Sequence, residues 1–211
     1  MRDADLLTLT QWLSPAYPVG AFAWSHGLER AVSRGDVASA DDLFDWLRGV
    51  LENGAGRSDA ILLCAAYAAD DVGPVADLAG ALAPSRERKM ETLQQGAAFA
   101  ATTRALWGFN LPDMTYPVAV GRAARLAGLP VEATTLIWLQ AFASNLTQCA
   151  QRLLPIGQTK GQKILHDLGP TITQVAAAAQ TASLDDIGSA TFAVDTASMQ
   201  HAEQYARIFR S

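Results

Sequence analysis

The chain has 211 residues, of which 50% are hydrophobic and 18% charged, and its formal net charge at pH 7 is -5. This composition is typical of a globular protein and unlike that of a disordered chain. A chain with this charge lacks the basic surface that binds nucleic acids, so we expect no nucleic-acid partner. Cys64 and Cys149 lie far apart in the sequence, and we expect two separate thiols rather than a metal or redox pair.

The beginning of the chain is charged at Arg2, Asp3 and Asp5 and continues as an amphipathic helix through Leu13. A secretory signal would place a longer apolar stretch here. We therefore expect a cytoplasmic protein.

Apolar residues recur at helical spacing along most of the chain. The clearest run has Ser39 as its expected N-cap and Leu43, Trp46, Leu47 and Val50 on one face. Ser58 and Ser85 are expected to cap two further helices, of which the second ends near Trp107. The expected helices are, in chain order, one near the start, one after Ser39, 59–69, 74–83, one after Ser85, 118–127, 131–153, about 159–167, 170–182 and 198–211.

No run of alternating β-branched residues predicts a strand, and no linker divides the chain. The sequence therefore predicts an all-α fold, a single-domain bundle of about eight to ten helices over residues 1–211. Residues 183–197 are expected to form a loop. Residues 183–211 as a whole are expected to be a segment that docks on a partner, because chain ends are poorly ordered unless something holds them.

The segment 133–151 carries no charge over 19 residues, which is close to the length of a membrane span. It contains too many Thr, Gln, Ser and Asn residues for lipid, so we expect no membrane insertion. A helix buried on most sides fits better, and its uncharged length predicts a homodimer interface that includes residues 131–153.

An enzyme is the alternative function. Asp41, Asp42 and Asp45 spell D-D-x-x-D, a pattern that holds Mg²⁺ against a diphosphate in all-α prenyl-diphosphate-type enzymes. That chemistry needs a second acidic cluster on a facing helix, and Asp185-Asp186 lacks the spacing. Acidic residues at a helix N-terminus are also favoured by the helix dipole alone. The three histidines show no metal-ligand spacing, so we expect no metal site, no cofactor and no catalytic group.

The segment 14–29 reads S-P-A-Y-P-V-G-A-F-A-W-S-H-G-L-E and has no charge before Glu29. Its prolines stop a helix, and Phe22 and Trp24 follow in the same loop. A long uncharged aromatic loop needs a covering surface, either from its own domain or from a partner.

This segment resembles the N-terminal signature of the urease accessory protein F family (UreF), roughly S-P-x-x-P-V-G-x-F-x-x-S-x-G-L-E. Four later blocks resemble the same family in the same order: Gly96-Ala97-Ala98-Phe99, Tyr116-Pro117-Val118-Ala119-Val120-Gly121, the run LPIGQTKGQ at 154–162, and the ending MQHAEQYARIFRS at 199–211. In the last block Ala202 separates His201 from Glu203, and Ala206 stands where the family usually has Ser.

The resemblance implies an all-α homodimer that is not itself an enzyme. It also implies a complex with accessory protein D, also called H, and with the nickel-binding GTPase accessory protein G. Family members regulate that GTPase and pass nickel toward apo-urease.

The resemblance places Phe22 and Glu29 in the region that the family uses toward the GTPase and the nickel route. Glu29 carries the only fixed negative charge in 14–29, so we expect it to face a partner and its replacement to leave folding intact. Arg152 matches a basic position near that route, although the helix dipole also favours a cation there.

The resemblance also places Gln158, Gly161 and Gln162 in a central polar block. It assigns Tyr205, Arg207 and Phe209 to a tail that docks on accessory protein D/H. The spacing of Tyr205, Ile208 and Phe209 predicts an apolar stripe on a short helix. Docking of this stripe on its own domain is the alternative.

Overall fold

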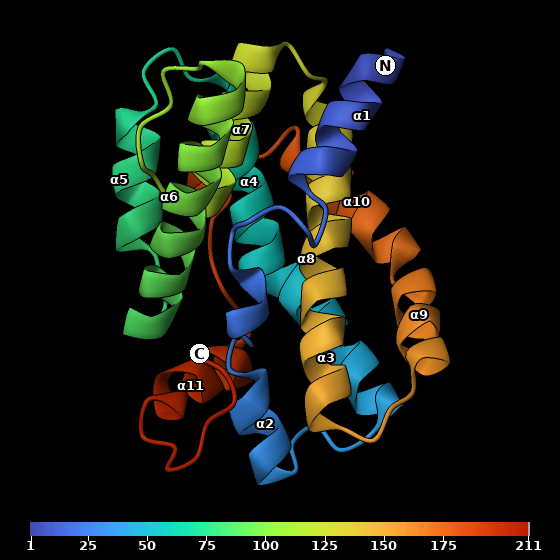
Figure 1. The fold of residues 1–211 in the computed structure, drawn as a ribbon. Coiled ribbons are helices and arrows are strands. Elements are labelled where there is room, and N and C mark those ends of the chain that lie inside the picture. Colours follow the sequence, from blue (N-terminus) through green and yellow to red (C-terminus); the bar gives the residue numbers. More distant parts are fainter. Residues whose placement is uncertain (211) are drawn as a thin grey trace.

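The computed structural model describes residues 1–210, and Ser211, the last residue of the expected C-terminal helix, lies outside them. The described residues form α-helices and short 3-10 turns without a strand (Figure 1), which confirms the all-α prediction. In chain order the elements are α1 (Asp3–Trp12), η1 (Ala21–Ala23), α2 (Leu28–Arg34), α3 (Ala40–Asn53), α4 (Ala55–Ala68), α5 (Gly73–Ala81), α6 (Arg86–Trp107), α7 (Tyr116–Ala127), α8 (Val131–Leu153), α9 (Gln158–Asp167), α10 (Gly169–Ala179), η2 (Leu184–Asp186) and α11 (Phe192–His201).

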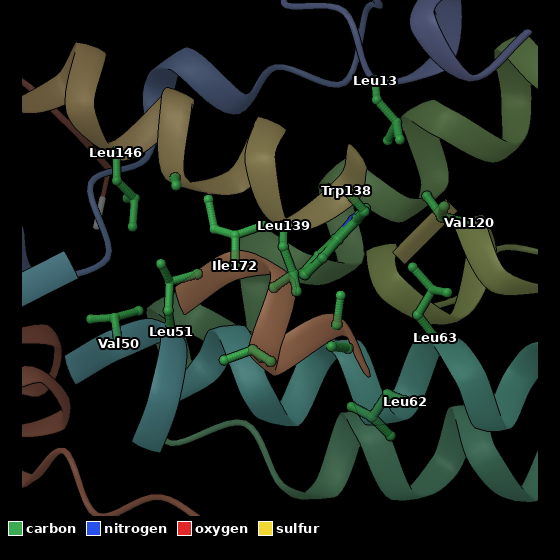
Figure 2. Close-up of a cluster of buried hydrophobic side chains, with 14 of the residues drawn as sticks. Leu13, Val50, Leu51, Leu62, Leu63, Val120, Trp138, Leu139, Leu146 and Ile172 are labelled. Carbon is green, nitrogen blue, oxygen red and sulfur yellow. The ribbon is translucent and has the colours of Figure 1, made fainter. Parts of the chain in front are cut away.

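Helix α8 runs through the middle of the molecule, with α9 and α10 on one side and α4 to α7 on the other (Figure 1). Helices α2 and α11 lie together at the end of the molecule near the C-terminus. Figure 2 shows the core, in which Trp138, Leu139 and Leu146 of α8 lie among Leu63 of α4 and Ile172 of α10. The long central helix therefore organises the packing of the others.

Much of the uncharged stretch of α8 is buried within the chain itself. Thr134, Thr135 and Thr147 are buried, and their hydroxyls donate to the carbonyls of Pro130, Val131 and Ala143, one turn earlier. Leu136 and Gln140 of the same helix are exposed, so the homodimer interface along this helix stays a prediction. Within residues 1–210, no helix combines the length and the apolar character needed to cross a bilayer.

The serine caps were predicted with mixed success. The hydroxyl of Ser39 accepts from the backbone N–H of Asp42 at 3.1 Å, and Ser85 caps α6 in the same way through Arg88. Ser58 does not cap a helix, because α4 begins three residues earlier, and its hydroxyl donates to the carbonyl of Gly188 at 3.1 Å. Helix α10 also ends earlier than expected, at Ala179.

The predicted end of the chain was wrong. The expected loop 183–197 contains the start of α11, and residues 202–210 form turns and bends instead of the expected helix 198–211. Helix α11 buries the small residues Ala197 and Ser198 and exposes Phe192. The reason is a close approach to Gly27, since a Cβ atom there would lie 2.6 Å from the backbone nitrogen of Ser198. An apolar pattern cannot mark a buried face that is made of small residues.

Both cysteines are free, which agrees with the prediction. Cys149 is buried, and its Sγ donates to the carbonyl of Trp24 at 3.2 Å. Burial, together with the charge of Glu91, raises the pKa of Cys149 to about 12, so this group remains a thiol at neutral pH.

Helices α4 and α7 touch at Gly121, where an added Cβ atom would lie 2.2 Å from the carbonyl oxygen of Leu63. We expect Gly121→Ala to lower the free energy of unfolding by about 1–3 kcal/mol, because overpacking pushes the two helices apart. Gly49→Ala in α3 is the matched control. An added Cβ atom there meets nothing within 4 Å, so that variant should gain up to about 1 kcal/mol of helix propensity. Urea unfolding of both variants measures the difference, and equal effects would contradict the close approach.

Candidate functional site

The C-terminal tail, residues 202–210, lies against the signature loop, residues 14–29. The N–H of Arg210 donates to the carbonyl of Ala23 at 2.7 Å. The N–H groups of Ile208 and Phe209 donate to the two carboxylate oxygens of Glu29 at 2.7 and 3.0 Å. Phe209 is buried, and Figure 1 shows the C-terminus next to α2. Two of the five sequence blocks, from opposite ends of the chain, therefore form one structural unit.

Glu29 is at the centre of a group of ionisable side chains, which we call the Glu29 cluster: the buried Glu29, Glu87 and His201, and the exposed Arg207. His201 Nε2 lies 2.9 Å from Glu29 Oε2, and His201 Nδ1 lies 3.4 Å from Glu87 Oε2. Arg207 Nη1 reaches Glu87 Oε1 at 3.2 Å. Glu29 itself is only 5% exposed. The expectation that its carboxylate faces a partner therefore disagrees with the structure, in which Glu29 holds the tail in place.

Arg152, at the last turn of α8, connects the same two segments from a third direction. Its Nη1 donates to the carbonyl of Phe22 at 3.2 Å, and its guanidinium lies 4.4 Å from the ring centroid of Phe209. A guanidinium over an aromatic face is a favourable cation–π contact. Phe22, Arg152 and Phe209, from three separate parts of the sequence, thus meet at one place.

A groove of about 370 Å³ begins at this place, and we call it the glutamine groove. Its lining includes Phe22, Gln148, Gln151, Arg152, Gln158 and Gln162. Gly161 lets α9 approach α8 here, because an added Cβ atom would lie 2.2 Å from Gln151 Nε2. That Nε2 is buried and has no hydrogen-bond partner among residues 1–210. Amide side chains both donate and accept, so this groove suits the backbone of a bound polypeptide.

Tyr205 has a different environment from the other predicted tail residues. Its side chain is fully exposed, as are large parts of Ile208, Met199 and Phe192. Phe209 is buried instead, so the predicted helical stripe of Tyr205, Ile208 and Phe209 does not exist. Of these three side chains, only Phe209 is buried against its own domain, although the backbone N–H groups of Ile208 and Arg210 also bond to the signature loop.

A cavity of about 260 Å³, which the sequence analysis did not predict, lies under the signature loop, and we call it the central cavity. Loop residues including Pro15, Tyr17 and Phe22 line it on one side, and α6 and α8 line the others. His26, Asp59, Arg88 and Glu91 are among its polar lining residues. One signal was present, since Arg88, Glu91 and Gln95 share the buried face of α6 with Phe99, an unusual place for polar groups.

The ionisable side chains in this cavity shift one another's pKa values. Glu91 forms an ion pair with Arg88, and its carboxylate lies 2.9 Å from Nε2 of His26. Burial alone would raise the pKa of Glu91, but Arg88 and His26 lower it to about 2. Burial and the neighbouring Arg88 lower the pKa of His26, so its imidazole is neutral at pH 7. Burial raises the pKa of Asp59 to about 6, because Arg88 Nη2, at 3.9 Å, offsets only part of the cost.

The aspartates of the alternative enzyme lie on the exposed first turns of α3. The carboxylate of Asp42 accepts from the N–H groups of Ala38 and Ser39, and Asp45 pairs with Arg48 at 2.9 Å. Asp41 and Asp42 are thus placed where the helix dipole favours them. Residues 1–210 contain no group of three or more His, Cys, Asp or Glu side chains that could hold a metal ion.

Comparison with known proteins identifies the family. The sequence model of the family described as UreF matches residues 37–169, more than half of the chain. The chain belongs to the UreF family. It is 50% identical over 213 residues to the urease accessory protein UreF of Roseobacter denitrificans, covering 100% of this chain and 96% of that protein. It is 53% identical over 209 residues to the UreF of Cereibacter sphaeroides strain KD131, covering 99% of this chain and 100% of that protein.

These UreF relatives align beyond the region matched by the family model. The signature loop and the tail, which lie outside residues 37–169, are therefore included in the similarity. The recognition of the family from five sequence blocks is confirmed.

The Glu29 cluster predicts a large loss of stability on Glu29→Ala. The change leaves His201 and two backbone N–H groups without their buried acceptor, so we expect the free energy of unfolding to fall by about 2–4 kcal/mol. Glu203→Ala, an exposed change in the same segment, should alter it by less than about 0.5 kcal/mol. Urea denaturation compares the two variants, and similar small effects would mean that Glu29 is not required for the fold.

The raised pKa of Asp59 predicts that the free energy of unfolding depends on pH. The folded state keeps the proton of Asp59 up to a pKa of about 6, whereas an unfolded aspartate loses it near about pH 4. The protonated carboxyl of Asp59 therefore contributes its full stabilisation of the folded state below about pH 4, and this contribution is lost as the pH rises through about 6. We expect Asp59→Asn to raise the free energy of unfolding at pH 7.5 by about 2 kcal/mol, and this gain to disappear near about pH 4. A gain that does not change with pH would contradict the assignment.

Proposed function

We propose that this chain is a non-enzymatic urease maturation factor. In this proposal it bridges urease accessory protein D/H and the GTPase accessory protein G, and regulates GTP-dependent delivery of nickel to apo-urease. The observation that carries the proposal is membership of the UreF family, with similarity over nearly the whole chain to proteins named urease accessory protein UreF. Nickel is the cargo in this account and not a resident cofactor.

The glutamine groove supports a contact with the GTPase. Arg152 is exposed at its rim and supplies a fixed positive charge, while Phe22 adds an aromatic side chain that is 45% exposed. Arginine and aromatic residues carry most of the binding energy at protein interfaces. Gln158 and Gln162, on the exposed side of α9, add donors and acceptors beside them.

Helix α11 and the tail support the contact with accessory protein D/H. Phe192, Met199, Tyr205 and Ile208 are large apolar residues that this segment leaves exposed. The backbone of the tail is already held by Glu29, so a partner would meet an ordered segment instead of folding a free one. Preorganisation of this kind lowers the entropic cost of binding.

We also propose that the protein is a cytoplasmic homodimer. The exposed Leu136 of α8 fits an interface that includes residues 131–153, as the sequence predicts. Helix α1 offers a second apolar face, because Leu6 and Leu7 are exposed on it at 43% and 69%. Homodimer interfaces are more apolar than the remaining surface of a protein.

Two single variants test the bridging proposal by affecting different partners. We expect Arg152→Gln to weaken capture of the GTPase at least about 30-fold and to leave capture of accessory protein D/H intact, because its guanidinium is a central anchor. Tyr205→Ala should weaken capture of accessory protein D/H and leave capture of the GTPase intact. Lys160→Gln, which removes one exposed charge from α9, is the control and should change neither. Co-purification from a reconstituted mixture measures all three, and retention of both partners by both variants would contradict the proposal.

A further inference from the structure

The wall of the central cavity is a row of aromatic rings. The ring centroids of His26 and Phe142 are 5.0 Å apart, those of Phe142 and Trp138 are 5.6 Å apart, and those of Trp138 and Tyr116 are 6.3 Å apart. All four residues line the cavity. The faces of Phe, Trp and Tyr rings carry partial negative charge and attract cations, most strongly where water is excluded.

The formal charges of the described residues that line the cavity do not cancel. Arg88 and Glu91 form one buried ion pair, His26 is neutral at pH 7, and Asp59 is an additional carboxylate. The lining side chains of residues 1–210 therefore carry a net charge of about -1 when Asp59 is ionised. A neutral or anionic ligand would leave this charge uncompensated.

Asp59 is poorly compensated by the protein itself. Its side chain is 17% exposed, and its nearest cation, Arg88 Nη2, is 3.9 Å away. Among residues 1–210 its carboxylate accepts no hydrogen bond in addition to this long ion pair. A largely buried carboxylate without a close cation is stabilised by any cation that reaches it, because much of its hydration has already been lost on folding.

The ligand that fits is an organic cation on an apolar stem. A divalent metal ion would need several oxygen or nitrogen ligands around it, and no such group of side chains is present in the described part of the chain. An arginine side chain meets the conditions better. Its guanidinium can bind a carboxylate through two hydrogen bonds and stack on aromatic rings, and its methylene groups suit the apolar wall.

We propose that the central cavity binds an arginine side chain of a partner protein, with the guanidinium on Asp59 and the stem against Tyr116, Trp138 and Phe142. The cavity of about 260 Å³ has room for a side chain and not for a folded element. The inference rests on the proposed function only for the source of this arginine, a partner protein.

A titration with a model side chain tests the site without any partner. The probe is Nα-acetyl-arginine methylamide, and Nα-acetyl-citrulline methylamide is its neutral control of nearly identical shape. The NMR signal of the Trp138 indole N–H, assigned by its loss in Trp138→Phe, reports binding. We expect a saturable shift with the arginine probe and at least tenfold weaker binding of the citrulline probe.

Asp59→Asn should weaken binding of the arginine probe at least tenfold. Asp41→Asn, which removes an equal charge from the exposed start of α3, should leave it within twofold. Circular dichroism and the melting temperature establish that both variants are folded. Absence of a saturable shift in the wild-type protein, equal binding of the two probes, or unchanged binding by folded Asp59→Asn would each overturn the cation site.

Competition identifies the source of the cation. A saturating arginine probe should reduce capture of accessory protein D/H or of the GTPase at least tenfold, and the citrulline probe should not. If the probe binds but both partners are captured as before, the partner arginine is ruled out. If the wild-type chain captures neither partner, the proposed function fails, while the titration still decides the chemistry of the cavity.

Discussion

The carboxylate of Glu29 is the contact on which the arrangement of the candidate site depends. Its Oε1 accepts from the N–H of Ile208 and its Oε2 from the N–H of Phe209, while His201 Nε2 lies 2.9 Å from the same Oε2. One side chain from the start of α2 thus fixes both the end of α11 and the tail. Because a buried charge is costly unless it is paired, this geometry leaves the tail little freedom to adopt another position. Because Glu29 holds the tail, the ring of Phe209 lies against the guanidinium of Arg152, which lines one end of the glutamine groove.

The signature loop takes part in two separate sites. Phe22 lines both the glutamine groove and the central cavity, and its carbonyl is held by Arg152. The groove is polar and lies at the surface, where amide side chains can meet a polypeptide backbone. The central cavity is lined by aromatic rings and by the charged side chains of Asp59, Arg88 and Glu91, and we propose that it holds a single cationic side chain. The loop therefore forms part of the wall of both sites.

Local rules were sufficient for most of the helices and insufficient for the site. Ser39 and Ser85 marked the starts of α3 and α6 because their hydroxyls satisfy backbone N–H groups that every helix leaves open. Helix α11 escaped prediction because its contact with Gly27 needs small residues, which leave no apolar stripe. The burial of Glu29 depends on residues 172 to 180 positions away in the chain, and no local pattern contains them. Phe22, Arg152, Gln158 and Gln162, which the sequence analysis singled out separately, line one groove, and this proximity was not predicted.

Hydrogen exchange at single backbone amides tests the role of Glu29 most directly. The N–H groups of Ile208 and Phe209 are the two donors to its carboxylate, and the account predicts that both exchange at least about 100-fold more slowly than in an unfolded chain. The amide of Tyr205, in the exposed part of the same tail, is the internal reference and should exchange much faster. Exchange of Ile208 and Phe209 at the unprotected rate, with the amides of α8 still protected, would contradict the central claim that Glu29 holds the tail on the signature loop.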